Sequence, residues 1–240
     1  MIMETERKIG HLHPLTIAQR DVELIMRGLG FDIAFGPELE SEHYNFDVLN
    51  MPADHPSRDM QDTLWLKPEH RTKEFQILRT HLSGVQVREM EKRTMPTRVT
   101  VLYGRVFRNE ATDASHEANY YQMEALYVDK KVTLADLKGT LTYFCKKFFN
   151  DDNVKIRFRP SYFPFVEPAL EVDMWWKDRW LEIAGSGLVH PNVLRAAGVD
   201  PEVWTGYAFS FGIDRLMMLR HGVPDIRLSY TGDLRFVQQF

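Results

Sequence analysis

The sequence has a single cysteine and no long apolar run. One cysteine, Cys145, cannot form an internal disulfide or a cysteine-based zinc site, and it fits a reducing compartment. Apolar stretches such as residues 216–219 are far shorter than the roughly 20 residues that cross a bilayer. The first eight residues carry charges of both signs and no apolar core, so we expect no signal peptide. These absences predict a cytoplasmic globular protein.

Several common catalytic motifs are missing as well. The sequence contains neither G-x-x-x-x-G-K-[ST] nor G-x-G-x-x-G, the two usual phosphate-binding loops. It has no H-E-x-x-H and no cysteine cluster for a catalytic zinc. Gly185-Ser186-Gly187 lacks the spacing of the G-x-S-x-G nucleophile elbow. Any chemistry therefore has to come from other arrangements of polar residues.

Size and charge are ordinary. The 240 residues include 30 Lys and Arg against 34 Asp and Glu, a formal net charge of −4. This balance argues against binding nucleic acid by bulk charge alone, although it leaves room for a locally basic face. Hydrophobic residues make up 44% of the chain, and no repeat, low-complexity tract or Gly/Ser linker divides it. We expect one continuous domain with a sizeable core.

Apolar periodicity predicts an antiparallel sheet faced by helices. Helical stripes predict helices over residues 15–29 and 134–149, the second with a capping box of Thr133 and Asp136. Alternating positions predict strands near residues 31–40, 99–110, 121–129, 154–159, 170–176 and 179–183. We expect irregular chain over residues 42–73, a short helix at 192–197 and a final helix at 209–221. Hairpins with helices between them favour an α+β fold class over a βαβ arrangement.

Polar residues interrupt two predicted strands that form a hairpin. Gln122 and Glu124 share one face of a strand, and Arg108 and Glu110 share a face of its partner. Four polar groups on one side of a hairpin suit a zwitterion or a nucleotide. The commoner cause of such a pattern is a solvated sheet face with cross-strand ion pairs. The pattern alone leaves both interpretations open.

A second group combines aromatic and acidic residues. Phe163 and Phe165 stand beside Glu167, and Glu182 follows on another predicted strand. Carboxylates on adjacent strands suit Mg²⁺ with a triphosphate. Core aromatics with solvated acids are the alternative interpretation.

The last predicted helix carries a third candidate. Gly212 and Arg215 are three residues apart, which places them on one helical face. A small residue lets a ligand approach the backbone, and a guanidinium group suits phosphate. The pattern G-x-x-R by itself occurs often by chance.

Several longer segments occur together in one order. The first three are Gly28-Leu-Gly-Phe31 with Gly36-Pro37-Glu38, then Gly104-Arg-Val-Phe-Arg108-Asn-Glu110, then Phe211-Gly-Ile-Asp-Arg215-Leu. The more specific stretches are His43-Tyr-Asn-Phe-Asp-Val-Leu-Asn50, Leu78-Arg-Thr-His-Leu-Ser83, Arg157-Phe-Arg-Pro-Ser-Tyr-Phe-Pro-Phe165, Leu188-Val-His-Pro-Asn-Val-Leu194 and Asp233-Leu-Arg-Phe236. On these residues the chain, from about His13 to Phe240, resembles the catalytic module of the bacterial-type phenylalanyl-tRNA synthetase alpha subunit, a class II aminoacyl-tRNA synthetase.

The resemblance implies a fold, a reaction and partners. It implies the class II synthetase fold, an antiparallel sheet flanked by helices. It implies activation of L-phenylalanine with ATP and Mg²⁺ to phenylalanyl-adenylate, followed by transfer to tRNA(Phe). The family is a heterotetramer of two alpha and two beta subunits, so a beta subunit is an expected partner. In the class the first motif forms a dimer interface, so the helix at residues 15–29 is expected to face either a second copy or its own core.

The resemblance also assigns site residues. Arg108, matched to the α-phosphate and the substrate carboxylate, and Arg215, matched to the γ-phosphate, are the implied catalytic residues. The other implied ATP contacts are Glu110, His116, Tyr120 and Glu182, and the implied Mg²⁺ positions are Glu167 and Glu182. The implied phenylalanine contacts are the polar set His81, Ser83, Gln86, Gln122 and Glu124, the aromatic pair Phe163 and Phe165, and the small residue Ala208.

The chain departs from the family pattern in places. Ser210 stands where the family usually has glycine, and Asp214 stands where it usually has glutamate. The family's N-terminal coiled-coil arm is not part of this sequence, so we expect residues 1–12 to be a leader and 13–240 the catalytic domain. Two alternatives remain: a stand-alone paralogue that adenylates an amino acid without charging tRNA, and a non-catalytic binding module. Retention of the charged residues weighs against the binding module: Arg108, Glu110, Glu167, Glu182 and Arg215.

Overall fold

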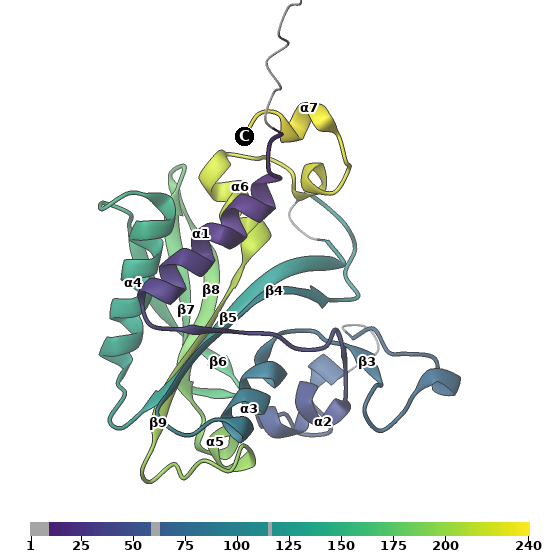
Figure 1. Ribbon diagram of the computed structural model, residues 1–240, viewed down its shortest axis with the longest axis vertical. Coiled ribbons are helices and arrows are strands. Elements are labelled where there is room, and N and C mark those ends of the chain that lie inside the picture. Colours follow the sequence, from purple (N-terminus) through teal and green to yellow (C-terminus); the bar gives the residue numbers. More distant parts are fainter. Residues whose placement is uncertain (1–9, 59–62, 115–116) are drawn as a thin grey trace, which may run out of the picture.

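A single large sheet organises the protein. The computed structural model describes residues 10–58, 63–114 and 117–240, and within them the sheet has seven strands in the order β1-β4-β5-β9-β8-β7-β6 (Figure 1). Its strands are β1 (Asp32–Ala34), β4 (Thr97–Phe107), β5 (Asn119–Asp129), β6 (Ile156–Phe163), β7 (Val166–Trp176), β8 (Arg179–Val189) and β9 (Thr205–Gly212). Only β1 and β4 pair in parallel, and every other neighbouring pair is antiparallel. The predicted α+β class with an antiparallel sheet is confirmed.

Three helices cover one face of this sheet. They are α1 (Pro14–Gly28), α4 (Leu134–Phe149) and α6 (Ile213–His221). Their apolar stripes share one core cluster with alternate sheet residues such as Met123, Phe209 and Phe211. The helices predicted at residues 15–29 and 134–149 are confirmed, and Thr133 and Asp136 form the expected capping box.

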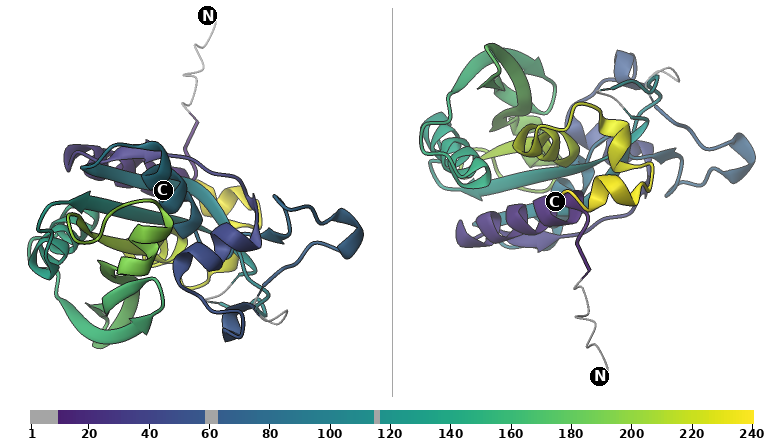
Figure 2. Two further views of the ribbon diagram at one scale, coloured as in Figure 1. Left: turned by 90° about the horizontal axis from the view of Figure 1, so that it is seen from below. Right: turned by 90° about the horizontal axis from the view of Figure 1, so that it is seen from above.

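The opposite face carries another set of helices. They are α2 (Glu42–Asn45), α3 (Ser83–Lys92) and α5 (Pro191–Ala196), with the 3₁₀ turn η1 (Asp47–Leu49) (Figures 1 and 2). A second hydrophobic cluster joins α3, η1 and α5 to Leu126 of β5 and Val189 of β8. This face is less completely covered than the other, which leaves room for the pocket described below.

The remaining elements are short. A two-stranded sheet pairs β2 (Leu39–Glu40) with β3 (Ile77–Leu78), and the turns η2 (Pro56–Arg58) and η3 (Pro68–His70) lie between those strands in the sequence. After α6 the chain ends with η4 (Ile226–Ser229) and α7 (Leu234–Val237), and the ring of His13 before α1 lies 6.5 Å from that of Phe236. In the described part of the chain, no helix combines the length and apolar character needed to cross a membrane.

Four local predictions were wrong. Residues 209–212 form the end of β9 rather than a helix, because buried rings at 207, 209 and 211 alternate with half-buried small residues at 208, 210 and 212, which is the period of a strand. Strand β4 ends at Phe107, so Arg108 and Glu110 lie beyond the strand. Strand β8 continues through residues 185–187, and residues 31–40 form two short strands instead of one. Helix α3, within a region for which no element was predicted, is largely buried.

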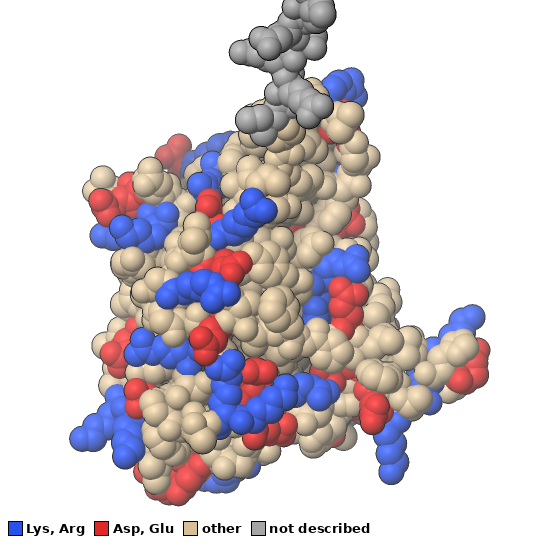
Figure 3. All heavy atoms as spheres, in the orientation of Figure 1, with Lys and Arg blue, Asp and Glu red and all other residues tan. Residues whose placement is uncertain are grey.

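Charge is mixed on the surface. On the face shown in Figure 3, basic and acidic side chains are interspersed rather than gathered into one basic field. This matches the small net charge of −4. The face therefore has no field of one sign to attract a polyanion.

Candidate functional site

A pocket of about 600 Å³ opens on the sheet face that carries α3 and α5. Volumes of this size suit small organic ligands. Eleven of the sequence-predicted residues line it: His81, Ser83, Gln86, Arg108, Glu110, Gln122, Glu124, Phe163, Phe165, Glu182 and Ala208. Tyr120 and Arg215 lie beside it, Glu167 lies apart, and His116 falls outside the described residues.

Strand register explains why distant residues meet in the pocket. Met123 and Ala125 of β5 belong to the core cluster shared with α1, α4 and α6, so the alternate residues Gln122 and Glu124 face the other side of the sheet. In the sheet, Glu124 pairs with Ser210 of β9, and Ser210 pairs with Gly185 of β8. Three strands therefore contribute one row of pocket floor.

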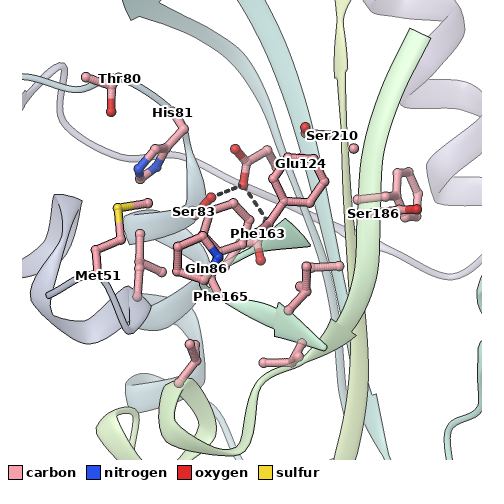
Figure 4. Close-up of a pocket in the computed structure, with 18 of the residues that line it drawn as sticks. Met51, Thr80, His81, Ser83, Gln86, Glu124, Phe163, Phe165, Ser186 and Ser210 are labelled. Atoms are coloured by element: carbon pink, nitrogen blue, oxygen red, sulfur yellow. Dashed lines mark hydrogen bonds between the residues drawn. The ribbon is translucent and has the colours of Figure 1, made fainter. Parts of the chain in front are cut away.

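Glu124 is the centre of the polar end. Its carboxylate accepts hydrogen bonds from Ser83 Oγ at 2.8 Å and from Gln86 Nε2 at 2.7 Å (Figure 4). It also accepts from the Leu82 backbone N–H at 3.0 Å. Burial raises the pKa of Glu124 from about 4.5 to about 7, although the hydrogen bonds from Ser83 and Leu82 oppose the shift. A carboxylate held this way in a pocket is suited to receive a cation.

Two other polar side chains at this end are buried without a partner. Both ring nitrogens of His81 and the Oε1 atom of Gln122 lack hydrogen-bond geometry with any neighbour among the residues described. Burial, with a smaller contribution from Arg108, lowers the pKa of His81 to about 4, and the Asn45 backbone opposes this. The imidazole is thus neutral near pH 7. Unpaired buried groups are costly, which favours a ligand as their partner.

Aromatic rings form one wall. Phe163 and Phe165 stack with ring centroids 5.9 Å apart, and a Cβ at Gly185 would lie 3.2 Å from the Phe163 ring. Asn50, at a left-handed φ of 59°, donates from its side-chain amide to the Pro164 carbonyl at 2.8 Å. The turn between the two rings is therefore held by a side chain that is distant in the sequence.

The end of the pocket near Ala208 is apolar. Leu126, Val189 and Val193 belong to one hydrophobic cluster, against which Phe165 and Ala208 pack. Ala208 pairs with Leu126 and with Gly187, and a Cβ at Gly187 would come within 2.7 Å of Val166. Small residues therefore leave space here, and the space has an aliphatic lining.

The other side of the pocket carries cationic groups. The Arg108 guanidinium lies 5.6 Å from the centre of the Tyr120 ring and 3.8 Å from the Glu110 carboxylate. A Cβ at Gly212 would lie 3.9 Å from both Tyr120 and Arg215. Tyr120, Gly212 and Arg215 thus border the same space, and guanidinium groups there suit phosphate oxygens.

The acidic residues are arranged differently from the prediction. Glu182 receives the Arg215 Nη1 donor on its backbone carbonyl at 3.1 Å, and burial together with Glu171 raises its side-chain pKa. Glu167 is exposed and lies 3.5 Å from His190. Glu182 of β8 pairs with Asp173 of β7. Asp173 and Glu167 are six residues apart on β7, a separation of about 20 Å along the strand. The prediction that Glu167 and Glu182 form one carboxylate pair is wrong.

The residues near Glu182 fit a cation only in part. Among the residues described, no group of three or more His, Cys, Asp or Glu side chains is placed to hold a metal alone. Glu171 and Glu182 do influence each other electrostatically, and a nearby divalent cation would relieve the raised pKa of Glu182. Glu171 already accepts hydrogen bonds from Arg159 Nη2 at 2.5 Å and from Ser161 Oγ at 2.9 Å, which leaves Glu182 as the carboxylate for a cation. Mg²⁺ usually keeps waters and phosphate oxygens as its other ligands.

Sequence reasoning did not assign roles to several residues that support the site. Arg79 is almost fully buried and donates to the backbone carbonyls of Gly36, Pro37 and Arg105 at 2.7–3.0 Å. Asp214 is buried and accepts from the Tyr121 N–H at 2.7 Å and from the Tyr230 hydroxyl. Arg79 lies within the family-like stretch of residues 78–83, and this was the one sequence feature that could have pointed to it.

Comparison with known proteins agrees with this geometry. A family model described as "tRNA synthetases class II core domain (F)" matches residues 1–240. Among solved structures, the crystal structure of pyrrolysyl-tRNA synthetase from Desulfitobacterium hafniense has a TM-score of 0.71 at 17% identity, over 95% of this chain and 76% of that one. That likeness concerns the fold, and together these findings define a class II synthetase core domain, as expected.

Closer relatives identify the family. The phenylalanine–tRNA ligase alpha subunit of Acaryochloris marina is 50% identical over 231 residues, 96% of this chain and 67% of that protein. The alpha subunit of Laribacter hongkongensis is 47% identical over 232 residues, 97% of this chain and 68% of that protein. The chain belongs to the phenylalanine–tRNA ligase alpha subunit family.

Proposed function

We propose that this chain activates L-phenylalanine with ATP to form phenylalanyl-adenylate, and then transfers the phenylalanyl group to tRNA(Phe). The observation that carries the proposal is one pocket with a buried carboxylate, Glu124, at one end and an aromatic and aliphatic lining around Ala208 at the other. A carboxylate suits the substrate ammonium group, and the apolar lining suits a benzyl ring. Ser83 and Gln86 orient the carboxylate.

The nucleotide is proposed to bind on the adjoining side. Tyr120 offers a ring for adenine, and Arg108 and Arg215 offer guanidinium groups for the phosphates. Glu110 lies beside Arg108 and is proposed to accept from the adenine amino group. His116 stays a proposed phosphate contact on the family resemblance alone.

The chemistry of activation explains this choice of residues. A carboxylate oxygen of phenylalanine attacks the α-phosphorus of ATP, and the bond from phosphorus to the pyrophosphate oxygen breaks. The attacking group is already an anion, so no general base is needed. The protein has to align two anions and offset charge that grows in the transition state. Arginines around the pocket, rather than a nucleophile triad, are suited to that task.

We propose Glu182 as the protein group that holds Mg²⁺ together with ATP. Bound there, the ion supplies positive charge that offsets the phosphates. Glu182 is partly desolvated and next to Arg215, which supports its place near the nucleotide. Glu167 remains a metal candidate on the family resemblance alone, at a separate place near His190.

Partners follow from the family name. The relatives are alpha subunits, so we propose a beta subunit as partner. Because tRNA is the proposed substrate, we propose that the protein is cytoplasmic.

For the first motif we propose a contact between two copies through α1. Leu24 is 70% exposed and Phe35 is 68% exposed, and the Phe35 ring stacks on Tyr103, whose hydroxyl donates to Glu23. Exposed apolar side chains on and near α1 favour an interface.

Pyrophosphate exchange tests the proposal. The assay is run with each of the twenty amino acids, on the chain alone and with a beta subunit added. We expect exchange that depends on phenylalanine, and aminoacylation of tRNA(Phe) when beta is present. Exchange without charging would favour the stand-alone paralogue, and absence of exchange under every condition would leave the non-catalytic module. Sedimentation of wild type against Leu24→Asp tests the contact between copies.

A further inference from the structure

Ser210 lies on the pocket floor and has no role in the proposed binding of phenylalanine or ATP. Strand β9 presents Ala208 and Ser210 to the pocket, and Gly212 follows beside Tyr120 and Arg215. Tyr207, Phe209 and Phe211 alternate with them and are buried in the core cluster shared with α1, α4 and α6. Successive pocket positions on a strand are about 6.6–6.8 Å apart. The strand therefore passes from the apolar end to the nucleotide side in two steps, with Ser210 in the middle.

The neighbours of Ser210 show what meets there. Across the sheet it pairs with Glu124 on one side and with Gly185 on the other. Directly paired residues have Cβ atoms about 4.5–5.5 Å apart. The Phe163 ring covers Gly185, and Glu124 is the centre of the polar end. Ser210 thus lies where the proposed ring, ammonium and phosphate regions adjoin.

The hydroxyl of Ser210 is available at that point. It lines the pocket, is half-buried, and makes no hydrogen bond to another described residue. Its acidic neighbour is already engaged, because Oε2 of Glu124 accepts from both Ser83 and Gln86. A serine hydroxyl is able to rotate and donate to an anion without adding net charge to the site.

We propose that Ser210 donates a hydrogen bond to the carboxylate of phenylalanine as it joins the α-phosphate, and to the acyl-phosphate group that results. The inference rests on the proposed function. It makes Ser210 a substrate-contacting residue of this chain, at a position where the family pattern has glycine and no side chain to donate. A hydrogen bond to an anion is stronger than one between neutral groups, so its loss is expected to be measurable.

The alternative role of Ser210 is steric, with the side chain only narrowing the pocket. The two roles differ in what Ser210→Ala does. Alanine keeps the Cβ and removes the hydroxyl, whereas Ser210→Gly removes both. A donor role predicts that both variants lose activity alike, and a steric role predicts that alanine behaves as wild type while glycine changes.

The experiment compares wild type, Ser210→Ala and Ser210→Gly in the complex with a beta subunit. We expect the rate constant of pyrophosphate exchange to fall on the order of tenfold in both variants. Calorimetry supplies a second readout: both variants should bind the non-hydrolysable analogue phenylalanyl-sulfamoyl adenosine about tenfold more weakly, and should bind phenylalaninol, which lacks the carboxylate, as wild type does.

Controls separate the possible failures. Ser229→Ala is the matched variant, because the Ser229 hydroxyl, like that of Ser210, has no hydrogen-bond partner among the described residues, but Ser229 lies in η4, outside the pocket. It should leave exchange unchanged. Wild type without exchange would contradict the proposed function itself. An active wild type with an equally active Ser210→Ala, or with equal loss of phenylalaninol binding, would overturn the role of Ser210 alone.

Discussion

Gln86 Nε2 lies 2.7 Å from Oε2 of Glu124, joining the buried helix α3 to strand β5. The same oxygen accepts from Ser83, the first residue of α3. A helix that covers the pocket is thus attached to the carboxylate proposed to bind the substrate. Binding of the ammonium group and packing of α3 are coupled through one side chain.

The ionisation of Glu124 predicts a pH dependence of phenylalanine binding. Burial raises its pKa to about 7, so the unliganded carboxyl is mostly protonated below that pH. An ammonium group needs the carboxylate, so the dissociation constant for phenylalanine should fall as pH rises from 5.5 to 7 and level off above. Calorimetry across this range measures it. Glu124→Gln should weaken binding about 30- to 100-fold and remove the dependence.

The same group predicts how stability depends on pH. Because the folded state raises the pKa of Glu124 above its ordinary value of 4.5, the associated stabilisation is complete below about pH 4.5 and is lost as pH rises to about 7. Urea unfolding at pH 5 and pH 7 measures this for the unliganded protein. A stability difference between these pH values that Glu124→Gln leaves unchanged would contradict the assignment.

Replacing Arg108 with lysine should affect the reaction more than amino-acid binding. Lysine keeps the charge but loses the planar fork that fits a phosphate. We expect Arg108→Lys to lower the rate constant of pyrophosphate exchange about 10²-fold, with the dissociation constant for phenylalanine changed less than threefold. Arg105→Lys is the matched control, since Arg105 pairs with exposed Glu38 instead of facing the pocket. Equal effects of the two variants would argue against the role of Arg108.

Filling the space at Ala208 should lower the use of phenylalanine. Valine adds two methyl groups opposite Leu126, at the apolar end. Overpacking and lost fit should reduce kcat/KM for phenylalanine about 10- to 10²-fold, and a smaller amino acid such as leucine should lose less. Ala135→Val, at an exposed position of α4, is the control. If the ratio of kcat/KM for phenylalanine to kcat/KM for leucine is unchanged, the substrate ring does not bind beside Ala208.

Arg79 should matter for stability. It is 4% exposed, and its guanidinium satisfies three backbone carbonyls of two separate segments. Arg79→Met should lower the free energy of unfolding by about 2–4 kcal/mol, because buried acceptors lose their donors. Urea denaturation measures the loss, and Arg235→Met, at a surface arginine, should change stability by less than about 0.5 kcal/mol.

The regular parts of the fold followed from periodicity, and the exceptions have physical causes. Helix α4 was predictable because its stripe and capping box agree. Helix α3 was not, because Gln86 and Glu89 are buried beside Val87 and no clean apolar stripe remains. In β9, Phe209 is buried and Ser210 is half-buried at the pocket, but the residues on the pocket face are small rather than charged, so the strand period is weakly marked in the sequence.

The candidate site divides along similar lines. Alternation alone placed Gln122 and Glu124 on one face, and the pocket now contains both. The pairing of Glu167 with Glu182 failed, since two acids on neighbouring strands meet only if the register brings them together. The left-handed backbone of Asn50 has no sequence signal in a single chain, because asparagine adopts that conformation only in certain contexts.

Along strand β9, residues that pack in the hydrophobic core alternate with residues that face the pocket. A saturation mutagenesis scan of residues 207–212, scored once for the amount of folded protein and once for charging, should therefore yield two profiles of period two that are out of phase. Substitutions at 207, 209 and 211 should appear in the abundance profile, and those at 208, 210 and 212 in the charging profile alone. A one-residue deletion would exchange the two sets and should fail in both assays.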